Sequence, residues 1–197
     1  MPAKIFFYVL LILFLCETDF LTAQRRYIDN AHGFSLGLGG SFSQGSGETS
    51  ESVDLTTGFA KSAEFIFSAG KISANHASTG YFACGAELYG DNTIAPVVDV
   101  GYFRFGNKEK YGKHGLAIAC GLSVLAVNTK EIVIAPEVGF GTSLSLDKMN
   151  SGVPRILSIS ISAGIKPSPG KLILVHLGTA GEKSLWVTTM GLSILFW

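Results

Sequence analysis

The feature that most constrains this chain is a two-residue alternation between bulky apolar and very small side chains. In residues 157–165, LSISISAGI, Leu or Ile occupies nearly every odd position, and Ser or Gly occupies most of the even ones. The same alternation runs through 33–44, 116–127 and 131–146. Successive side chains of a β-strand point to opposite faces of a sheet, so this period predicts strands. Helix signals are nearly absent, and we expect an all-β fold.

The character of the two faces separates two kinds of β protein. In a soluble sandwich or barrel, the face turned away from the core carries charged and larger polar side chains. Here that face is mostly Gly, Ala and Ser, and only 15% of the residues are charged. Small side chains fit the lumen of a narrow barrel, while Leu, Ile, Phe and Val would then face lipid. Alternating segments of about ten residues, separated by turns, are typical of transmembrane β-barrels. The barrel must close, because an open sheet edge in hydrocarbon leaves backbone groups unpaired. The alternative is a secreted β-sandwich or lipocalin-like barrel.

The N-terminal segment predicts export. A positive residue precedes an unbroken apolar run over residues 5–16, and a small residue follows near the expected cut. This is the pattern of a secretory signal peptide, and the run is shorter than the roughly 18 apolar residues of a spanning helix. We expect 1–23 to be a signal peptide cleaved near Ala23/Gln24, and 24–197 to form one barrel domain. The alternative is a retained anchor.

Composition excludes several functions. The net charge is zero, so a nucleic-acid partner has no electrostatic support. No zinc spacing, phosphate-binding loop or serine-hydrolase elbow occurs, so we expect neither a cofactor nor a metal. After the signal only Cys84 and Cys120 remain, too few for a disulfide scaffold. They fall on strands that are not neighbours, so we expect small apolar fillers rather than a bridge.

The stretch APVVDVGYFRFGNK (95–108), the Gly-rich alternating strands, the signal and the aromatic C-terminus resemble small outer-membrane β-barrel proteins of Gram-negative bacteria. The resemblance covers roughly residues 33–197. It implies a closed, antiparallel, up-and-down transmembrane barrel that is surrounded by outer-membrane lipid. It also implies the barrel insertion machinery as a partner, because in that family a C-terminal aromatic residue is read as the insertion signal. Phe196 and Trp197 match that position. Trp197 has the parity of the weaker apolar face, so we expect a bulge or a shifted last pairing.

Turn residues divide most of the chain into eight expected strands. They lie near 58–71, 79–90, 94–106, 114–127, 131–146, 155–166, 170–178 and 184–197. Tight connections alternate with longer polar ones. The longer ones are 71–79, 107–115, 146–154 and 178–184. Barrels of this kind place longer loops outside the cell, which puts the C-terminus on the periplasmic side. An eight-stranded barrel fills its interior with side chains and leaves no wide pore.

One segment does not fit this count. Residues 33–44 would be a ninth strand, and these barrels take even numbers. Either one strand has been split in two, or a further strand within 24–32 or 51–60 makes ten. We favour eight. The polar, acidic segment 45–57 is expected to be a mobile loop under either count.

Strand parity turns six ionisable residues toward the lumen. They are Glu64, Glu87, Asp99, Glu137, Lys166 and His176. Buried charges must be paired or neutralised, so we expect an acidic cluster relieved by Lys166 and Arg104. We interpret the set as an inward polar network that holds strand register, and a proton or ligand site is the alternative. A remote alternative is an outer-membrane lipid acyl hydrolase that uses Ser160, His176 and Glu137.

Aromatic residues near the expected strand ends are interpreted as girdles at the membrane interfaces. They are Tyr81, Tyr89, Tyr102, Phe103, Phe105, Tyr111 and Trp186. An aromatic ligand platform is the alternative.

These observations favour a non-enzymatic integral outer-membrane β-barrel. Its role would be structural, or an interaction with an unidentified extracellular ligand through its outer loops. The alternative is a narrow porin-like channel or carrier for a small solute. A Gly/Ala/Ser lumen crossed by charged residues argues against a wide pore.

Overall fold

The computed structural model describes residues 34–45, 47–60, 63–74, 77–90, 93–106, 114–147, 155–182 and 185–197. The expected signal peptide and its cleavage site lie outside these residues. Eleven strands occupy the described ranges. They are β1 (Ser35–Gly45), β2 (Glu48–Ala60), β3 (Ala63–Ala74), β4 (Ala77–Tyr89), β5 (Ile94–Phe105), β6 (His114–Val124), β7 (Val127–Asn128), β8 (Ile132–Ser145), β9 (Ile156–Ser168), β10 (Lys171–Glu182) and β11 (Leu185–Phe196).

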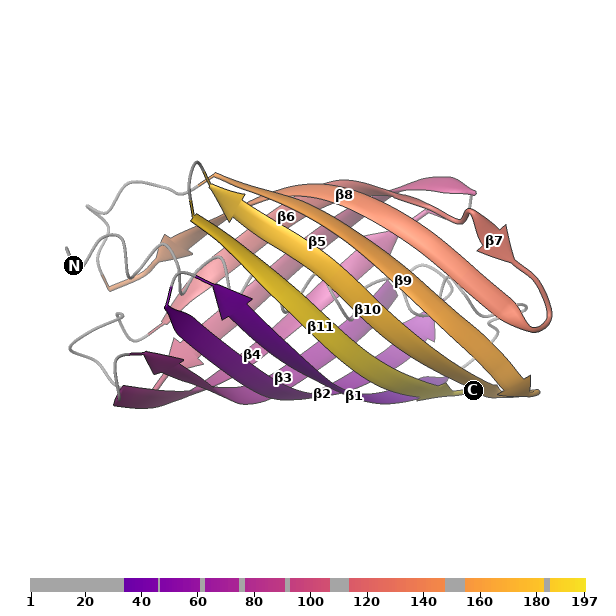
Figure 1. The fold of residues 1–197 in the computed structure, drawn as a ribbon, viewed down its shortest axis with the longest axis horizontal. Coiled ribbons are helices and arrows are strands. Elements are labelled where there is room, and N and C mark those ends of the chain that lie inside the picture. The colour runs from indigo at the N-terminus through magenta and orange to yellow at the C-terminus, as the bar shows by residue number, and fades with distance from the viewer. Residues whose placement is uncertain are drawn as a thin grey trace.

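Ten long strands form one closed antiparallel barrel (Figure 1). Each long strand pairs with its neighbours along the chain, and β1 closes the ring by pairing with β11. The short β7 pairs only with β8, while β6 pairs directly with β8. We call the end of the barrel where β11 finishes the C-terminal end. The opposite end is called the loop end, because the two longest intervals between strands, 106–113 and 146–155, lie there.

The closed all-β barrel is confirmed, but the preference for eight strands is wrong. The alternative of ten, with an additional strand within 51–60, is what the structure contains: β2 occupies most of the segment that was expected to be a mobile loop. Its lumen-facing residues are polar apart from Gly58, and among the β2 residues whose exposure the structure describes only Val53 and Leu55 are large exposed apolar residues. A strand whose inner face lines a polar lumen therefore has the composition of a loop.

The loop assignments at 71–79 and 178–184 are also wrong. β3 continues to Ala74 and β4 begins at Ala77, while β10 reaches Glu182 and β11 begins at Leu185. The strands extend beyond the belt of outward-facing apolar residues, which we call the apolar band. Because the strand ends outside this band are polar, the sequence pattern assigned them to loops.

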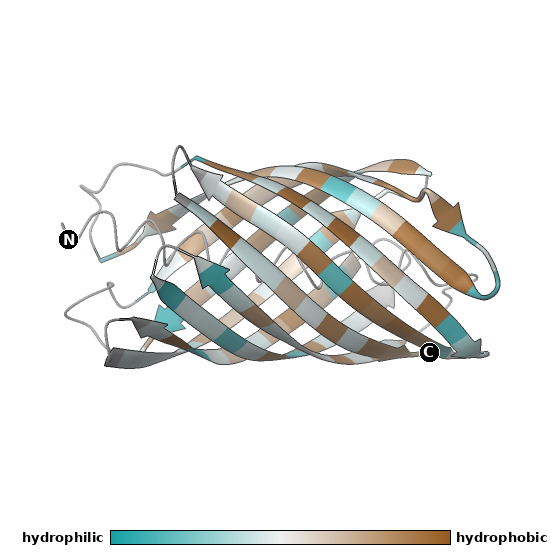
Figure 2. Cartoon of the chain, viewed as in Figure 1, coloured by the Kyte–Doolittle hydropathy of each residue, from teal (hydrophilic) through white to brown (hydrophobic). Residues whose placement is uncertain are grey.

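The bulky apolar side chains face outward. Hydrophobic and hydrophilic residues alternate along the strands of the barrel (Figure 2). In β9, Leu157, Ile159 and Ile161 are 41%, 51% and 43% exposed. Ser162, on the opposite face of the same strand, is only 8% exposed. Leaving a Leu or Ile side chain in water forfeits about 1.5–3 kcal/mol. Large apolar residues are exposed on all ten long strands, far beyond the apolar patches of a soluble monomer. Such a surface is stable only against hydrocarbon.

The lumen is lined by small and polar residues, but apolar side chains cross it near both ends. At the C-terminal end, five buried residues form a cluster against which Leu125 packs. They are Val133, Ala135, Leu172, Leu174 and Leu195. Near the loop end, the buried ring of Phe105 lies 6.3 Å from that of Tyr81 and 5.4 Å from that of Phe103, measured between centroids. We call these the apolar cluster and the aromatic cluster.

The girdle interpretation is therefore wrong for four residues. Tyr81, Tyr89, Phe103 and Phe105 are buried in the lumen. Their nearness to strand ends favoured a girdle, but parity decides direction: Tyr81 and Tyr89 share the odd parity of the lumen-facing Glu87. The half-buried Tyr102 and the exposed Trp186 have the outward parity. Tyr111 lies outside the described residues.

Two lumen glycines make room for these rings. A Cβ atom added at Gly70 would lie 2.6 Å from the Tyr81 hydroxyl oxygen, and it would also meet the Glu51 carbonyl oxygen. A Cβ added at Gly115 would meet the ring of Phe103. Each ring thus occupies the space that a side chain on the neighbouring strand would need.

Candidate functional site in the barrel lumen

Three carboxylic acids lie side by side across β3, β4 and β5. Glu64 is directly opposite Glu87, and Glu87 is directly opposite Asp99. Directly opposed side chains have Cβ atoms about 4.5–5.5 Å apart. Glu64 and Glu87 are fully buried and Asp99 is 8% exposed. We call this set the acidic row.

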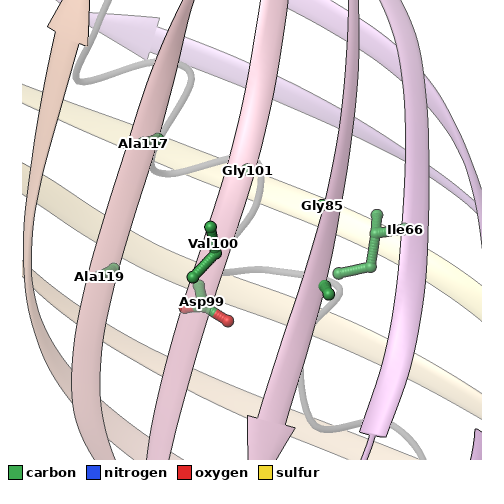
Figure 3. A pocket seen from close by; sticks show the side chains of 8 residues that line it. Ile66, Gly85, Asp99, Val100, Gly101, Ala117 and Ala119 are labelled. Carbon is green, nitrogen blue, oxygen red and sulfur yellow. The ribbon is translucent and has the colours of Figure 1, made fainter.

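A small cavity adjoins the acidic row (Figure 3). Its volume is roughly 10 Å³, and its walls include Asp99, Ile66, Ala117 and Ala119. A cavity of this size holds about one water molecule. The space beside the carboxylate is thus far too small for an organic substrate.

A second polar cluster surrounds His176 on β10. Its Nδ1 atom lies 2.9 Å from the Ser162 hydroxyl on β9, and its Nε2 atom lies 3.1 Å from the Ser193 hydroxyl on β11. All three residues are buried. In a neutral imidazole one nitrogen donates and the other accepts, so a hydroxyl can satisfy each nitrogen in either tautomer. We call this arrangement the histidine cluster.

Polar contacts continue around the wall from the histidine cluster. The Ser52 hydroxyl on β2 donates to Asp54 Oδ2 at 3.0 Å, and it also bonds the Ser41 hydroxyl on β1 at 2.8 Å. Ser193 and Asp54 are both opposite Gly39 on β1. The polar lining therefore runs from β9 through β10, β11 and β1 to β2, tying together the strands at which the barrel closes.

The structure places the six predicted lumen residues in different surroundings. Glu64, Glu87, Asp99 and His176 are buried, whereas Glu137 and Lys166 are half-buried. The Lys166 ammonium group donates to Asn128 Oδ1 at 2.7 Å and to the Thr129 carbonyl oxygen at 3.0 Å, near the C-terminal end.

The predicted relief of the acidic row by Arg104 is wrong, because Arg104 is exposed on the outer surface. Sequence reasoning also missed two buried acids, Glu48 and Asp54. Both belong to β2, and the outward parity of Val53 and Leu55 was the available signal that Asp54 faces inward.

The residues proposed for a hydrolase are not assembled. Glu137 is directly opposite Ser160, but both ring nitrogens of His176 bond to Ser162 and Ser193 instead. Among the described residues, no group of three or more His, Cys, Asp and Glu side chains could hold a metal ion. Cys84 and Cys120, which both lie in the described part of the chain, are free thiols.

The last strand, β11, contains no bulge. β11 pairs in unbroken register with β1 and β10 as far as Phe196, so the expected shift in pairing is wrong. Phe196 has the outward parity, and its ring lies 5.8 Å from the Lys171 ammonium group. Trp197 follows the strand, and its N–H donates to the Gly170 carbonyl oxygen at 3.1 Å.

Comparisons with known proteins identify the fold. No protein-family model matches the sequence, and the search of curated proteins returns no match. Among solved structures, the translocator domain of autotransporter NalP from Neisseria meningitidis is similar, with a TM-score of 0.59, 12% identity, and coverage of 94% of this chain and 95% of that one. The COG4313 outer membrane channel from Pseudomonas putida F1 has a TM-score of 0.55 at 8% identity, covering 86% and 97% of the two chains.

The fold, the closed strand pairing and the apolar outer surface together define the class of this protein. Its fold is that of the small outer-membrane β-barrels of Gram-negative bacteria. In the part of the chain that the structure describes, no helix is long and apolar enough to cross a membrane.

Proposed function

We propose that this barrel is a non-enzymatic envelope protein that does not conduct, and that it acts structurally or through its outer loops. The observation that supports this best is the burial of the lumen wall. Residues that line an open aqueous channel remain accessible to water, whereas the acidic row, the histidine cluster, the aromatic cluster and the apolar cluster are all 0–8% exposed. A barrel filled in this way is a scaffold that holds its loops at the surface.

The positions of the longer loops determine the orientation that we propose for the barrel in the membrane. The intervals 106–113 and 146–155 are the longest connections between strands and both lie at the loop end. Outer-membrane barrels carry their longer loops on the extracellular side. The loop end would then face outward and the C-terminal end would face the periplasm.

Conductance in planar lipid bilayers tests the closed lumen. The wild-type protein should give no steady ohmic steps. A variant that removes the apolar cluster, Leu172→Ala with Leu174→Ala, should conduct or gate, while the matched outward variant Val175→Ala with Leu177→Ala should stay silent. Steady ohmic steps from the folded wild-type protein would refute the proposal.

A second candidate, a narrow cation channel, is favoured by one observation, the acidic row. A row of carboxylates in a narrow passage attracts cations. If this candidate is right, the wild-type protein should give small cation-selective conductance steps. The double variant Glu64→Gln with Glu87→Gln should abolish these steps. The hydrolase reading has weaker support, because Ser160 is not bonded to His176.

Complementation separates the two forms of the leading proposal. A strain lacking the protein can be given either the full chain or a chain in which 106–113 and 146–155 are replaced by short Gly/Asn turns. If the role is structural, the short-loop barrel should restore resistance to detergent. If the role is a surface interaction, only the full chain should restore the phenotype of the wild type.

We also propose that the insertion machinery recognises the C-terminal aromatic pair. Phe196 ends the paired part of β11 on the outward face, where a partner in the membrane can contact it. Phe196→Ala should therefore slow assembly more than Leu195→Ala, whose side chain belongs to the apolar cluster. Pulse-chase assembly, followed by the heat-dependent gel shift of folded barrels, measures the difference.

A further inference from the structure

Two outward-facing glycines, Gly80 on β4 and Gly106 directly after β5, lie side by side near the loop end. Lys71 is directly opposite Gly80, and the Gly106 N–H donates to the Gly80 carbonyl oxygen at 2.9 Å. Among the described residues, a Cβ atom added at Gly80 would come within 4 Å of the Gly70 carbonyl oxygen alone, at 3.8 Å, and one at Gly106 would meet the Gly80 carbonyl oxygen alone, at 3.4 Å. Two adjacent outward positions therefore carry no side chain. We call this the glycine hollow.

Two cations flank the glycine hollow. Lys71 lies on its β3 side, and Arg104 lies on β5, directly opposite the exposed Phe82. The strands are spaced about 4.8 Å apart and rise about 3.4 Å per residue, which puts the two Cα atoms about 12 Å apart. Long Lys and Arg side chains can converge on one group in the space between them.

The surrounding charges leave these cations available. Glu51 is the cross-strand neighbour of Lys71, but it lies on β2, on the far side of Lys71 from the glycine hollow. Within the described part of the chain, neither Lys71 nor Arg104 forms an ion pair with Glu51 or with another residue. The nearby imidazole of His114 lies 3.6 Å from the carboxylate of Asp147 and stacks on the Tyr102 ring.

The apolar band begins directly beneath the glycine hollow. Phe82 is 46% exposed, and the next outward row toward the middle of the barrel includes Phe67, Tyr102 and Leu116. A ligand bound here would meet cations at one end and a hydrocarbon-facing surface at the other. Its chemistry is thus an anionic head joined to acyl chains.

We propose that the glycine hollow binds a phosphorylated lipid of the leaflet at the loop end. The phosphate rests over Gly80 and Gly106 and receives charge-assisted hydrogen bonds from Lys71 and Arg104, because guanidinium and ammonium groups pair well with phosphate oxygens. An acyl chain lies along Phe82 and Phe67. This inference depends on the barrel class and not on whether the barrel conducts.

Native mass spectrometry of the folded full-length barrel tests the site. The probes are lipid A carrying two phosphates and the same lipid after removal of its phosphates. The wild-type protein should prefer the phosphorylated lipid about thirtyfold, from the contribution of two basic side chains close to an anionic lipid surface. Lys71→Gln with Arg104→Gln should abolish this preference.

Two further variants separate a defined site from diffuse surface charge. Arg155→Gln with Lys130→Gln removes two exposed cations elsewhere and should keep the preference. Gly80→Val keeps both cations but fills the glycine hollow, so it should reduce the preference severalfold. The heat-dependent gel shift verifies that each variant is folded.

Three results would overturn the proposal. One is an equal loss of preference in the control pair, and another is an unchanged preference in Gly80→Val. The third is full competition by excess inorganic phosphate, since that would mean that the acyl chains contribute nothing.

Discussion

Two glycines on neighbouring strands allow a sharp test of how the lumen is packed. Gly70 on β3 faces the lumen and Gly80 on β4 faces outward. A methyl group at Gly70 would lie 2.6 Å from the Tyr81 hydroxyl oxygen and 2.7 Å from a ring carbon of Tyr81, and it would also meet a backbone carbonyl oxygen of Glu51. A methyl group at Gly80 would meet none of the described residues at less than 3.8 Å.

The two Gly→Ala substitutions should therefore differ in sign. Overpacking a site that cannot relax costs about 1–3 kcal/mol, so Gly70→Ala should destabilise the barrel by that amount. Replacing Gly by Ala at an unstrained position stabilises by about 0.4–1 kcal/mol, because the unfolded chain loses freedom. Gly80→Ala should therefore be slightly stabilising.

Equilibrium unfolding in urea, with the protein reconstituted in lipid vesicles, measures both changes. Tryptophan fluorescence and the heat-dependent gel shift serve as independent probes. In a double-mutant cycle, Gly70→Ala should cost less in a Tyr81→Ala background than in the wild type, because the side-chain part of the clash is already removed and only the backbone part is left. Equal effects of the two Gly→Ala substitutions, or the same cost of Gly70→Ala in both backgrounds, would contradict this account of the lumen.

Three other predictions test separate parts of the barrel. Leu172→Ala should lower the free energy of unfolding by about 2–5 kcal/mol, because it leaves a cavity in the fully buried apolar cluster. A loss of less than about 1 kcal/mol in urea unfolding would mean that the apolar cluster is loosely packed. Ser162→Ala should lower the free energy of unfolding by about 1–3 kcal/mol, because it removes the hydroxyl that bonds the buried His176 Nδ1, whereas Ser160→Ala on the same face should be nearly neutral. Similar losses in the two variants would contradict a stabilising role for the histidine cluster. Cys120 should react with a membrane-permeant maleimide and resist an impermeant one in vesicles, because its exposed side chain faces the apolar band; rapid labelling by the impermeant reagent would place it in water.

The class of fold was predictable because one physical requirement dominates the sequence. A strand between lipid and a narrow lumen needs large apolar residues on one face and small ones on the other, and β9 has this pattern over residues 157–165. The same requirement explains why β2 was missed. Its inner positions Ser50, Ser52 and Asp54 are polar, so its mean hydropathy is that of a loop while its parity is that of a strand.

The lumen was only partly predictable, for a different reason. Parity within one strand fixes which side chains point inward, and Glu64, Glu87 and Asp99 are buried in the structure. Which of them become neighbours depends on the register between strands, and register depends on where each turn lies. Parity therefore predicted an acidic cluster, but it could not show that Glu64, Glu87 and Asp99 are direct neighbours while Glu137 lies apart from them on β8.

Strand parity explains why the expectation for Arg104 was wrong. Arg104 was expected to relieve the acidic cluster, but it lies five residues after the lumen-facing Asp99 on the same strand, and an odd step along a strand reverses the face. The same reversal that removes Arg104 from the lumen places it at the edge of the apolar band, across one strand from Lys71. The guanidinium group of Arg104 therefore cannot pair with the acidic row in the lumen. It lies instead at the membrane surface, where a lipid phosphate can bind it without entering the hydrocarbon.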